Sequence, residues 1–196
     1  MKDPRSIGLR LIGTALCLCA CIAFAQTSSN KRVDDKALRD STKNGDAWLT
    51  YGRDYAETHF SPLKQIDVSN VTRLGLAWSW ETESPSGGRV EGTPLFSNGV
   101  LYGSLAWDVL FAVDARTGKM KWRWDPEIAR QPISGLCCGP VNRGVALYHD
   151  KVYAGLLDGR LVALDQETGK LVWQSQVLND SHFGRSRGQG QSDRRE

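Results

Sequence analysis

Residues 112–122 read AVDARTGKMKW, and residues 163–173 read ALDQETGKLVW, so one pattern occurs twice, 51 positions apart. In both copies a short apolar run ends in Ala-x-Asp, continues through Thr-Gly-Lys and closes on a tryptophan. Apolar runs of this length predict β-strands, and Thr-Gly favours the tight turn of a hairpin. The tryptophan is large enough to fill the gap to a neighbouring sheet. A period near fifty residues, with several strands per unit, predicts the blades of a β-propeller.

The strands expected around the repeat extend the pattern in both directions. They are residues 74–80, 100–103, 109–114, 120–124, 152–155, 161–165 and 171–173. Two similar hairpins in a β-sandwich are the alternative interpretation. Residues 48–178 hold about three blades, whereas propellers close with roughly 4–8. The prediction is therefore all-β, an incomplete propeller whose open edge could also dock on another chain.

The first 25 residues have the organisation of a secretory signal peptide. Lys2, Arg5 and Arg10 precede an apolar run over residues 11–24, and cleavage is expected after Ala25. Lipoprotein processing at Cys21 and a retained membrane anchor are the alternatives. With cleavage, no transmembrane segment is expected, and the predicted location is the periplasm.

Three further regions follow the signal. Residues 26–47 form a polar leader with a short helix expected near residues 34–40, and residues 48–178 carry the partial propeller. Residues 179–196 have almost nothing apolar to bury and are predicted to be a disordered or aberrant polar tail.

Composition limits the functions that the chain can have. The chain has 196 residues, 40% of them hydrophobic and 7 of them Trp, which is enough for a buried core. A net charge of +3 is too small to indicate a nucleic-acid partner. Three of the 5 cysteines, Cys17, Cys19 and Cys21, lie in the signal. In an oxidising compartment Cys137 and Cys138 should pair, either between molecules or, as their adjacency favours, with each other.

Residues 135–144 read GLCCGPVNRG and suggest a ligand site. Neighbouring Cα atoms lie about 3.8 Å apart, below the usual disulfide span of about 4.4–6.8 Å, so a Cys137–Cys138 ring would be small and stiff. Its flat sulfur face would suit a planar ligand, and the Arg143 guanidinium matches a carboxylate. The stretch predicts a pocket for a flat, anionic molecule. Two ordinary thiols and a solvated arginine are the simpler alternative.

The chain resembles the pyrroloquinoline quinone (PQQ)-dependent alcohol dehydrogenases of the methanol/ethanol type. The resemblance covers residues 48–173 and rests on YGR at 51–53, FSPL at 60–63, LAW at 76–78, EGTP at 91–94, both repeats and CCGPVNRG at 137–144. It implies an eight-bladed propeller in which Cys137–Cys138 forms a vicinal disulfide under one face of PQQ. It also implies that Arg143 pairs with a PQQ carboxylate or quinone-side oxygen and that Glu91 contacts the cofactor. Without the resemblance, Glu91 would be read as a solvated turn residue.

The resemblance further implies oxidation of a primary alcohol to an aldehyde, with Ca²⁺ or a lanthanide at the quinone and a cytochrome-type electron acceptor. We assign no catalytic residue and no metal ligand in this chain. Its candidate carboxylates are read as structural: Asp108, Asp114, Asp158 and Asp165. The expectation is an amino-terminal portion of such an enzyme, inactive alone. A non-catalytic envelope propeller module that binds other proteins is the alternative.

Overall fold

The computed structural model describes residues 31–43, 45–82, 89–128 and 138–178. One α-helix, α1 (Asp35–Arg39), and three short 3-10 helices, η1 (Asp40–Lys43), η2 (Val71–Arg73) and η3 (Ala106–Asp108), lie in these residues. The strands are β1 (Leu95–Ser97), β2 (Val100–Ser104), β3 (Leu110–Asp114), β4 (Met120–Trp124), β5 (Ala146–Tyr148), β6 (Lys151–Gly155), β7 (Arg160–Asp165) and β8 (Leu171–Gln176). None of the helices in this part of the chain is long and apolar enough to span a membrane.

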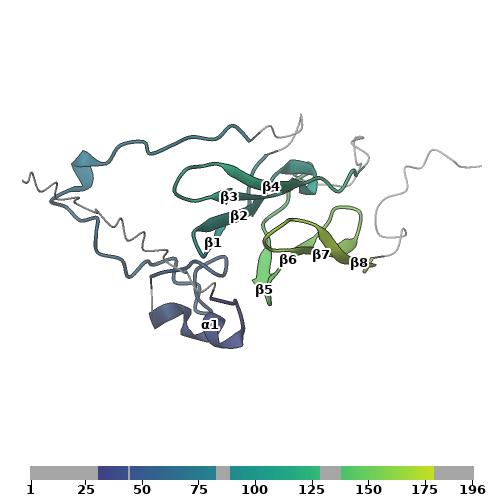
Figure 1. The fold of residues 1–196 in the computed structure, drawn as a ribbon, viewed down its shortest axis with the longest axis horizontal. Helices are drawn as coiled ribbons and strands as arrows, with labels where there is room; N and C mark the ends of the chain where they lie inside the picture. The colour runs from purple at the N-terminus through teal and green to yellow at the C-terminus, as the bar shows by residue number, and fades with distance from the viewer. Residues whose placement is uncertain (1–30, 44, 83–88, 129–137, 179–196) are drawn as a thin grey trace, which may run out of the picture.

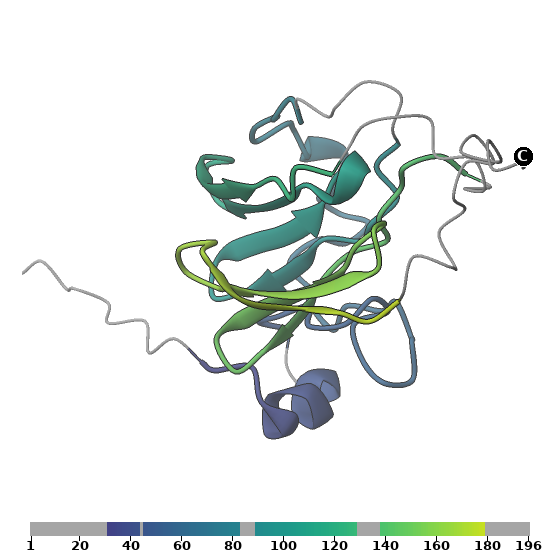
Figure 2. The ribbon, with the colours of Figure 1, turned by 90° about the vertical axis from the view of Figure 1, so that its right-hand side faces the viewer.

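The strands form two four-stranded antiparallel sheets, β1-β2-β3-β4 and β5-β6-β7-β8, which we call blade 1 and blade 2. The blades lie beside each other with the same strand order (Figures 1 and 2). Even their irregularities match, because the register shifts at Ala112/Val113 in blade 1 and at Ala163/Leu164 in blade 2. The repeat therefore encodes one structural unit twice, and the predicted all-β propeller architecture is confirmed.

An aspartate organises the tight turn of each repeat. In blade 2, Asp165 Oδ1 accepts hydrogen bonds from the backbone N–H of Thr168 at 2.8 Å and from its Oγ1 at 2.6 Å. Asp114 and Thr117 make the same pair of bonds in blade 1, both at 2.8 Å. In each turn the hydrogen bond from the Thr hydroxyl is the main reason that the pKa of the Asp carboxyl group lies below its usual range. The Asp-x-x-Thr-Gly signature is thus a self-contained hydrogen-bonded turn.

The tryptophan that ends blade 1 packs on the turn of blade 2. Trp122 is buried, and its Nε1 donates to the Gln166 carbonyl at 3.1 Å. A Cβ atom at Gly169 would lie 2.6 Å from the Trp122 ring, so only glycine leaves room there. Trp173, the equivalent residue of blade 2, is 39% exposed. The predicted role of the tryptophan as a filler between sheets is confirmed for Trp122.

The main apolar core lies between the two blades, and β3 alternates between this core and a second one. Leu110 and Ala112 face the core shared with blade 2, whereas Phe111 and Val113 belong to the cluster on the other face. Trp78 and Trp80 cover that second cluster. Period-two alternation with both faces buried makes β3 a central strand.

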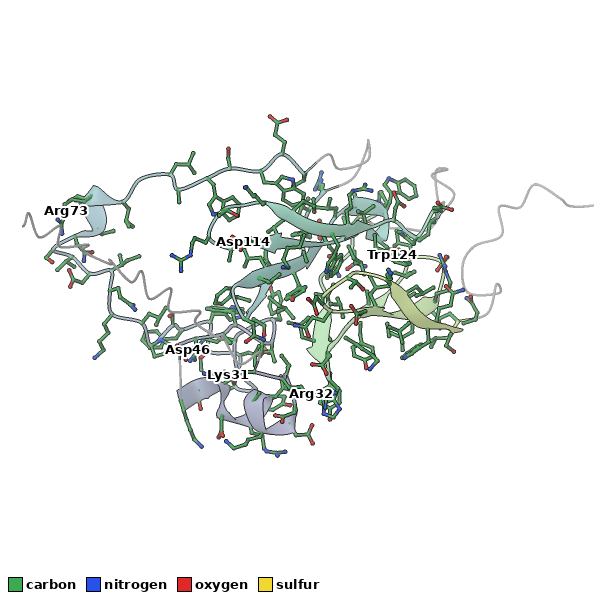
Figure 3. The ribbon with its side chains drawn as sticks, in the orientation of Figure 1. Lys31, Arg32, Asp46, Arg73, Asp114 and Trp124 are labelled. Carbon is green, nitrogen blue, oxygen red and sulfur yellow. The ribbon has the colours of Figure 1, made fainter. Side chains whose placement is uncertain are left out.

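Residues 31–43 are tied to both blades. Val33 is buried in the main core, and its carbonyl accepts from the His149 N–H at 2.8 Å. Arg32, labelled in Figure 3, pairs with Asp150 at 2.7 Å. The short helix expected near residues 34–40 is present as α1, capped by Asp34, whose Oδ1 accepts from the Ala37 N–H at 2.8 Å. This part of the expected leader therefore contributes to the folded core.

The strand expected at residues 74–80 is the point at which the sequence interpretation was wrong. The structure describes this segment and assigns no strand to it; Figure 1 shows it in the long arc that follows η2. A strand needs a partner for its backbone groups, and the segment pairs with none of the strands in the described residues. Trp78 instead packs against Gly118, and its Nε1 donates to the Ala115 carbonyl at 3.1 Å.

Two of the expected blades are consequently formed as complete sheets. Upstream of them, Trp48 makes an isolated β-bridge to Phe96 on β1, an edge strand of blade 1. The predicted signal peptide (1–25), the polar tail (179–196) and Cys137 lie outside the described residues.

Candidate functional site

An open hollow of about 510 Å³ lies where the connections of the two blades meet. Its lining comes from the β2–β3 connection, the loop that leads into β5 and the β6–β7 connection: Asp108, residues 141–145 and residues 155–157. The two connections are equivalent, because they follow the second strand of each blade. The loop between the blades carries Arg143, so the predicted CCGPVNRG motif leads directly to this hollow.

Arg143 and Glu91, both predicted as site residues, are brought together. A terminal guanidinium nitrogen of Arg143 lies 3.7 Å from Glu91 Oε2, while the Arg143 side chain remains 72% exposed. The backbone sets this proximity, because the segment after Glu91 packs closely on the Arg143 loop. A Cβ atom at Gly92 would lie 3.1 Å from the Gly144 nitrogen and 2.8 Å from Ser104 Oγ.

Of the two predicted cysteines, Cys138 is exposed at the start of the described loop. Gly139 follows it with a φ of 80°, a left-handed conformation that suits glycine. Cys137 lies outside the described residues, so the vicinal disulfide stays a prediction.

Asn142 fixes the loop immediately before Arg143. Its Nδ2 donates to Asp108 Oδ1 at 2.7 Å and to the Gly155 carbonyl at 3.1 Å. Its Oδ1 accepts from the Gly144 N–H at 3.0 Å, which closes the turn around Arg143. The Asn142 carbonyl also accepts from Ser104 Oγ at 3.3 Å. One buried amide thus connects both blades to the loop.

Asp108 is the other buried polar centre of the site. Its Oδ2 accepts from the Leu157 N–H at 2.5 Å, so its two oxygens bind two different segments of the chain. Burial raises the pKa of its carboxyl group, and the bonds from Leu157 and Asn142 oppose that rise. Although Asp108 contributes to the lining, it is only 1% exposed, and both of its carboxylate oxygens already accept hydrogen bonds from the protein.

Sequence reasoning missed the roles of Asp108 and Asn142. It treated Asp108 as a structural turn residue and Asn142 only as a letter of the motif. The repeat did contain one signal: the position equivalent to Asp108, 51 residues later, is Gly159. Both residues have positive φ, 58° and 82°. A non-glycine residue is uncommon in the left-handed region, so an aspartate where the other repeat has glycine marks position 108 for attention.

Within the described residues, no group of three or more His, Cys, Asp or Glu side chains could hold a metal ion. Arg143 is the basic side chain in the described lining of the hollow. A guanidinium with five N–H donors faces an open hollow, and a single carboxylate lies beside it.

Two adjacent four-stranded antiparallel blades, with a ligand-sized hollow at their connections, define this chain as part of a β-propeller protein. Residues 48–179 match the family model described as the β-propeller domain of PQQ glucose/ethanol/alcohol dehydrogenases. The chain belongs to this family, as the sequence resemblance predicted.

Individual relatives agree with the family model. A quinohemoprotein alcohol dehydrogenase, ADH IIB of Pseudomonas putida, is 51% identical over 91% of this chain and 24% of its own length. The crystal structure of the quinohemoprotein alcohol dehydrogenase of Comamonas testosteroni superposes with a TM-score of 0.69 at 47% identity, covering 74% of this chain and 22% of that one. A europium-containing methanol dehydrogenase gives 0.65 at 34% identity, covering 74% and 25%. The chain spans about a quarter of the length of these relatives.

Proposed function

We propose that this chain supplies part of the PQQ-binding wall of an exported dehydrogenase that oxidises primary alcohols to aldehydes. Bound PQQ would accept the two electrons removed from the alcohol, and a cytochrome-type acceptor would take them onward. Ca²⁺ or a lanthanide would complete the site, and we assign none of its ligands to this chain. The periplasm is the proposed location.

The observation that carries the proposal is the Arg143–Glu91 pair beside the hollow. Arg143 offers five N–H donors in a planar fork, so it can serve Glu91 and a ligand carboxylate together. The hollow of about 510 Å³ lies within the roughly 300–1,000 Å³ that is usual for small-molecule pockets. A flat anion such as PQQ fits this donor set. In the proposed complex, Arg143 binds and orients the cofactor and Glu91 keeps the guanidinium directed into the hollow.

The test is PQQ binding by the whole 196-residue chain, measured as the quenching of its tryptophan fluorescence. Arg143→Gln should weaken binding by at least ~10-fold, because a hydrogen bond to a charged group contributes about 1.5–3 kcal/mol. Arg32→Gln is the matched control. It removes the same charge and an ion pair, with Asp150, away from the hollow, and should leave the affinity unchanged.

Two results would contradict the proposal. One is the absence of saturable PQQ binding by the unsubstituted chain, and the other is equal affinity in all three proteins. Either would favour the alternative of a non-catalytic envelope module that binds other proteins, since such a module does not need Arg143.

A further inference from the structure

Asp108 lines the hollow but is almost fully buried, and both of its carboxylate oxygens bind other segments that line it. Oδ1 accepts from Asn142 at 2.7 Å, and Oδ2 accepts from the backbone N–H of Leu157 at 2.5 Å. Asp108 belongs to blade 1, in η3, whereas Leu157 belongs to the β6–β7 connection of blade 2. The carboxylate therefore joins the two blades at the loop that carries Arg143.

Asn142 directly precedes Arg143, and all the polar atoms of its side-chain amide are hydrogen-bonded. The Asn142 amide gives one N–H to Asp108 and the other to the Gly155 carbonyl, and its oxygen accepts from Gly144. Residues on both sides of Arg143 are thus held, although the Arg143 side chain itself is largely exposed. A long, exposed side chain binds a ligand well only when its backbone is fixed beforehand, because ordering it costs entropy.

We propose that Asp108 is a positioning residue, which holds Asn142 and thereby fixes the loop that presents Arg143 to the anionic ligand. The ligand part of this inference rests on the proposed PQQ function; the fixing of the loop does not. Asp108 acts through Asn142 and contacts no ligand.

The chemistry at position 108 requires an aspartate. An ionised carboxylate has acceptors only, and it faces two donors, Asn142 Nδ2 and the Leu157 N–H. An asparagine has one acceptor and one NH₂ group, so one of the two donors would face another donor. The backbone supports the same conclusion, because Asp108 adopts a φ of 58° where the repeat places Gly159. The side-chain bonds offset the cost of that conformation.

The experiment is a double-mutant cycle of Asp108→Asn and Arg143→Gln in the 196-residue chain, with PQQ as the probe. Asp108→Asn alone should weaken PQQ binding about tenfold, which corresponds to one buried donor left without an acceptor. In the Arg143→Gln background it should cause no further loss, because the group that it positions is gone. A merely structural role would weaken binding by the same factor in both backgrounds, and that result would overturn the proposal.

Asp114→Asn is the matched control, since Asp114 accepts backbone and hydroxyl hydrogen bonds in the same sheet but does not line the hollow. It should leave the PQQ affinity unchanged. If Asp108→Asn does not fold, Asn142→Ala cuts the same link from the other side and should be non-additive with Arg143→Gln in the same way. Additive losses would again overturn the proposal.

Amide hydrogen exchange without ligand separates this inference from the cofactor proposal. Asp108→Asn should accelerate exchange at the Gly144 N–H, which bonds to Asn142, by about tenfold. The Trp48 N–H, bonded to the Phe96 carbonyl on β1 and not to the Asp108–Asn142 network, should not change. If the unsubstituted chain binds no PQQ but Gly144 responds, the cofactor proposal fails and the positioning role stands. If Gly144 exchange is unchanged, the positioning role fails whatever PQQ does.

Discussion

Gly169→Ala tests the contact that joins the two blades, and the chain supplies a matched control in Gly99→Ala. Both glycines have left-handed backbones, with φ of 70° and 78°. Their surroundings differ. A Cβ atom at Gly169 would lie 2.6 and 2.7 Å from two Trp122 ring carbons, whereas one at Gly99 would meet nothing within 4 Å. Comparing the two substitutions therefore separates the cost of the backbone conformation from the cost of the clash.

The two costs can be sized from these contacts. An alanine in the left-handed region costs roughly 1–2 kcal/mol, and this cost is common to both variants. The clash at Gly169 adds about 1–3 kcal/mol, which is usual when extra carbon is forced into a packed site. Trp122 cannot easily move away, because it is 7% exposed and its Nε1 bonds to the Gln166 carbonyl. We expect Gly169→Ala to lower the free energy of unfolding by about 2–5 kcal/mol, and Gly99→Ala by about 1–2 kcal/mol.

The assay is urea unfolding of the 196-residue chain, monitored by far-ultraviolet circular dichroism. The free energy of unfolding is extrapolated linearly to water. Trp122→Ala provides the decisive background. Without the ring, Gly169→Ala should cost no more than Gly99→Ala does. Equal costs for the two glycines in the unsubstituted chain would refute the reasoning, as would an excess cost at Gly169 that persists after the ring is removed.

Two further predictions concern a hydrogen bond and a covalent bond. Thr168→Val removes the hydroxyl that holds the pKa of Asp165 below its usual range, so the Asp165 pKa should rise toward that range. Because a depressed carboxyl pKa stabilises the fold above the unfolded-state value of about 3.9, the loss of stability should be full at neutral pH and shrink in acid; a pH-independent loss in urea titrations would contradict it. For the predicted Cys137–Cys138 disulfide, thiol labelling of the signal-cleaved protein under denaturing, non-reducing conditions should find no free thiol at monomeric mass. Labelling of both thiols would refute the predicted disulfide.

The sequence by itself determined the two blades. The Ala-x-Asp-x-x-Thr-Gly-Lys-x-x-Trp pattern acts locally: the aspartate accepts from the threonine three residues later, and the glycine takes the left-handed turn position. Interactions between residues three or four positions apart can be read from a sequence, because the chain itself brings them together. The repeat spacing of 51 residues then predicted that the same sheet occurs twice.

The sequence also predicted Arg143 as a site residue from its own stretch, and Glu91 through the family resemblance, but it held no information on the distance between them. Their proximity of 3.7 Å follows from the close packing of Gly92 on the Gly144 backbone. Such an approach between distant segments depends on how blade 1 sits beside the loop into β5, and no local pattern encodes it.

Only the tertiary structure decided three other features. Residues 74–80 have the composition of a strand but form none, since strand formation depends on a neighbour to pair with. Val33 lies in a segment that reads as polar leader, yet it is buried between the blades. Asp108 reads only as a structural turn carboxylate, and its partners Asn142 and Leu157, both distant in the sequence, are seen only in the fold. Burial and pairing depend on what the rest of the fold places beside a residue, and this is why the blades could be predicted from the sequence but the contacts between their connections could not.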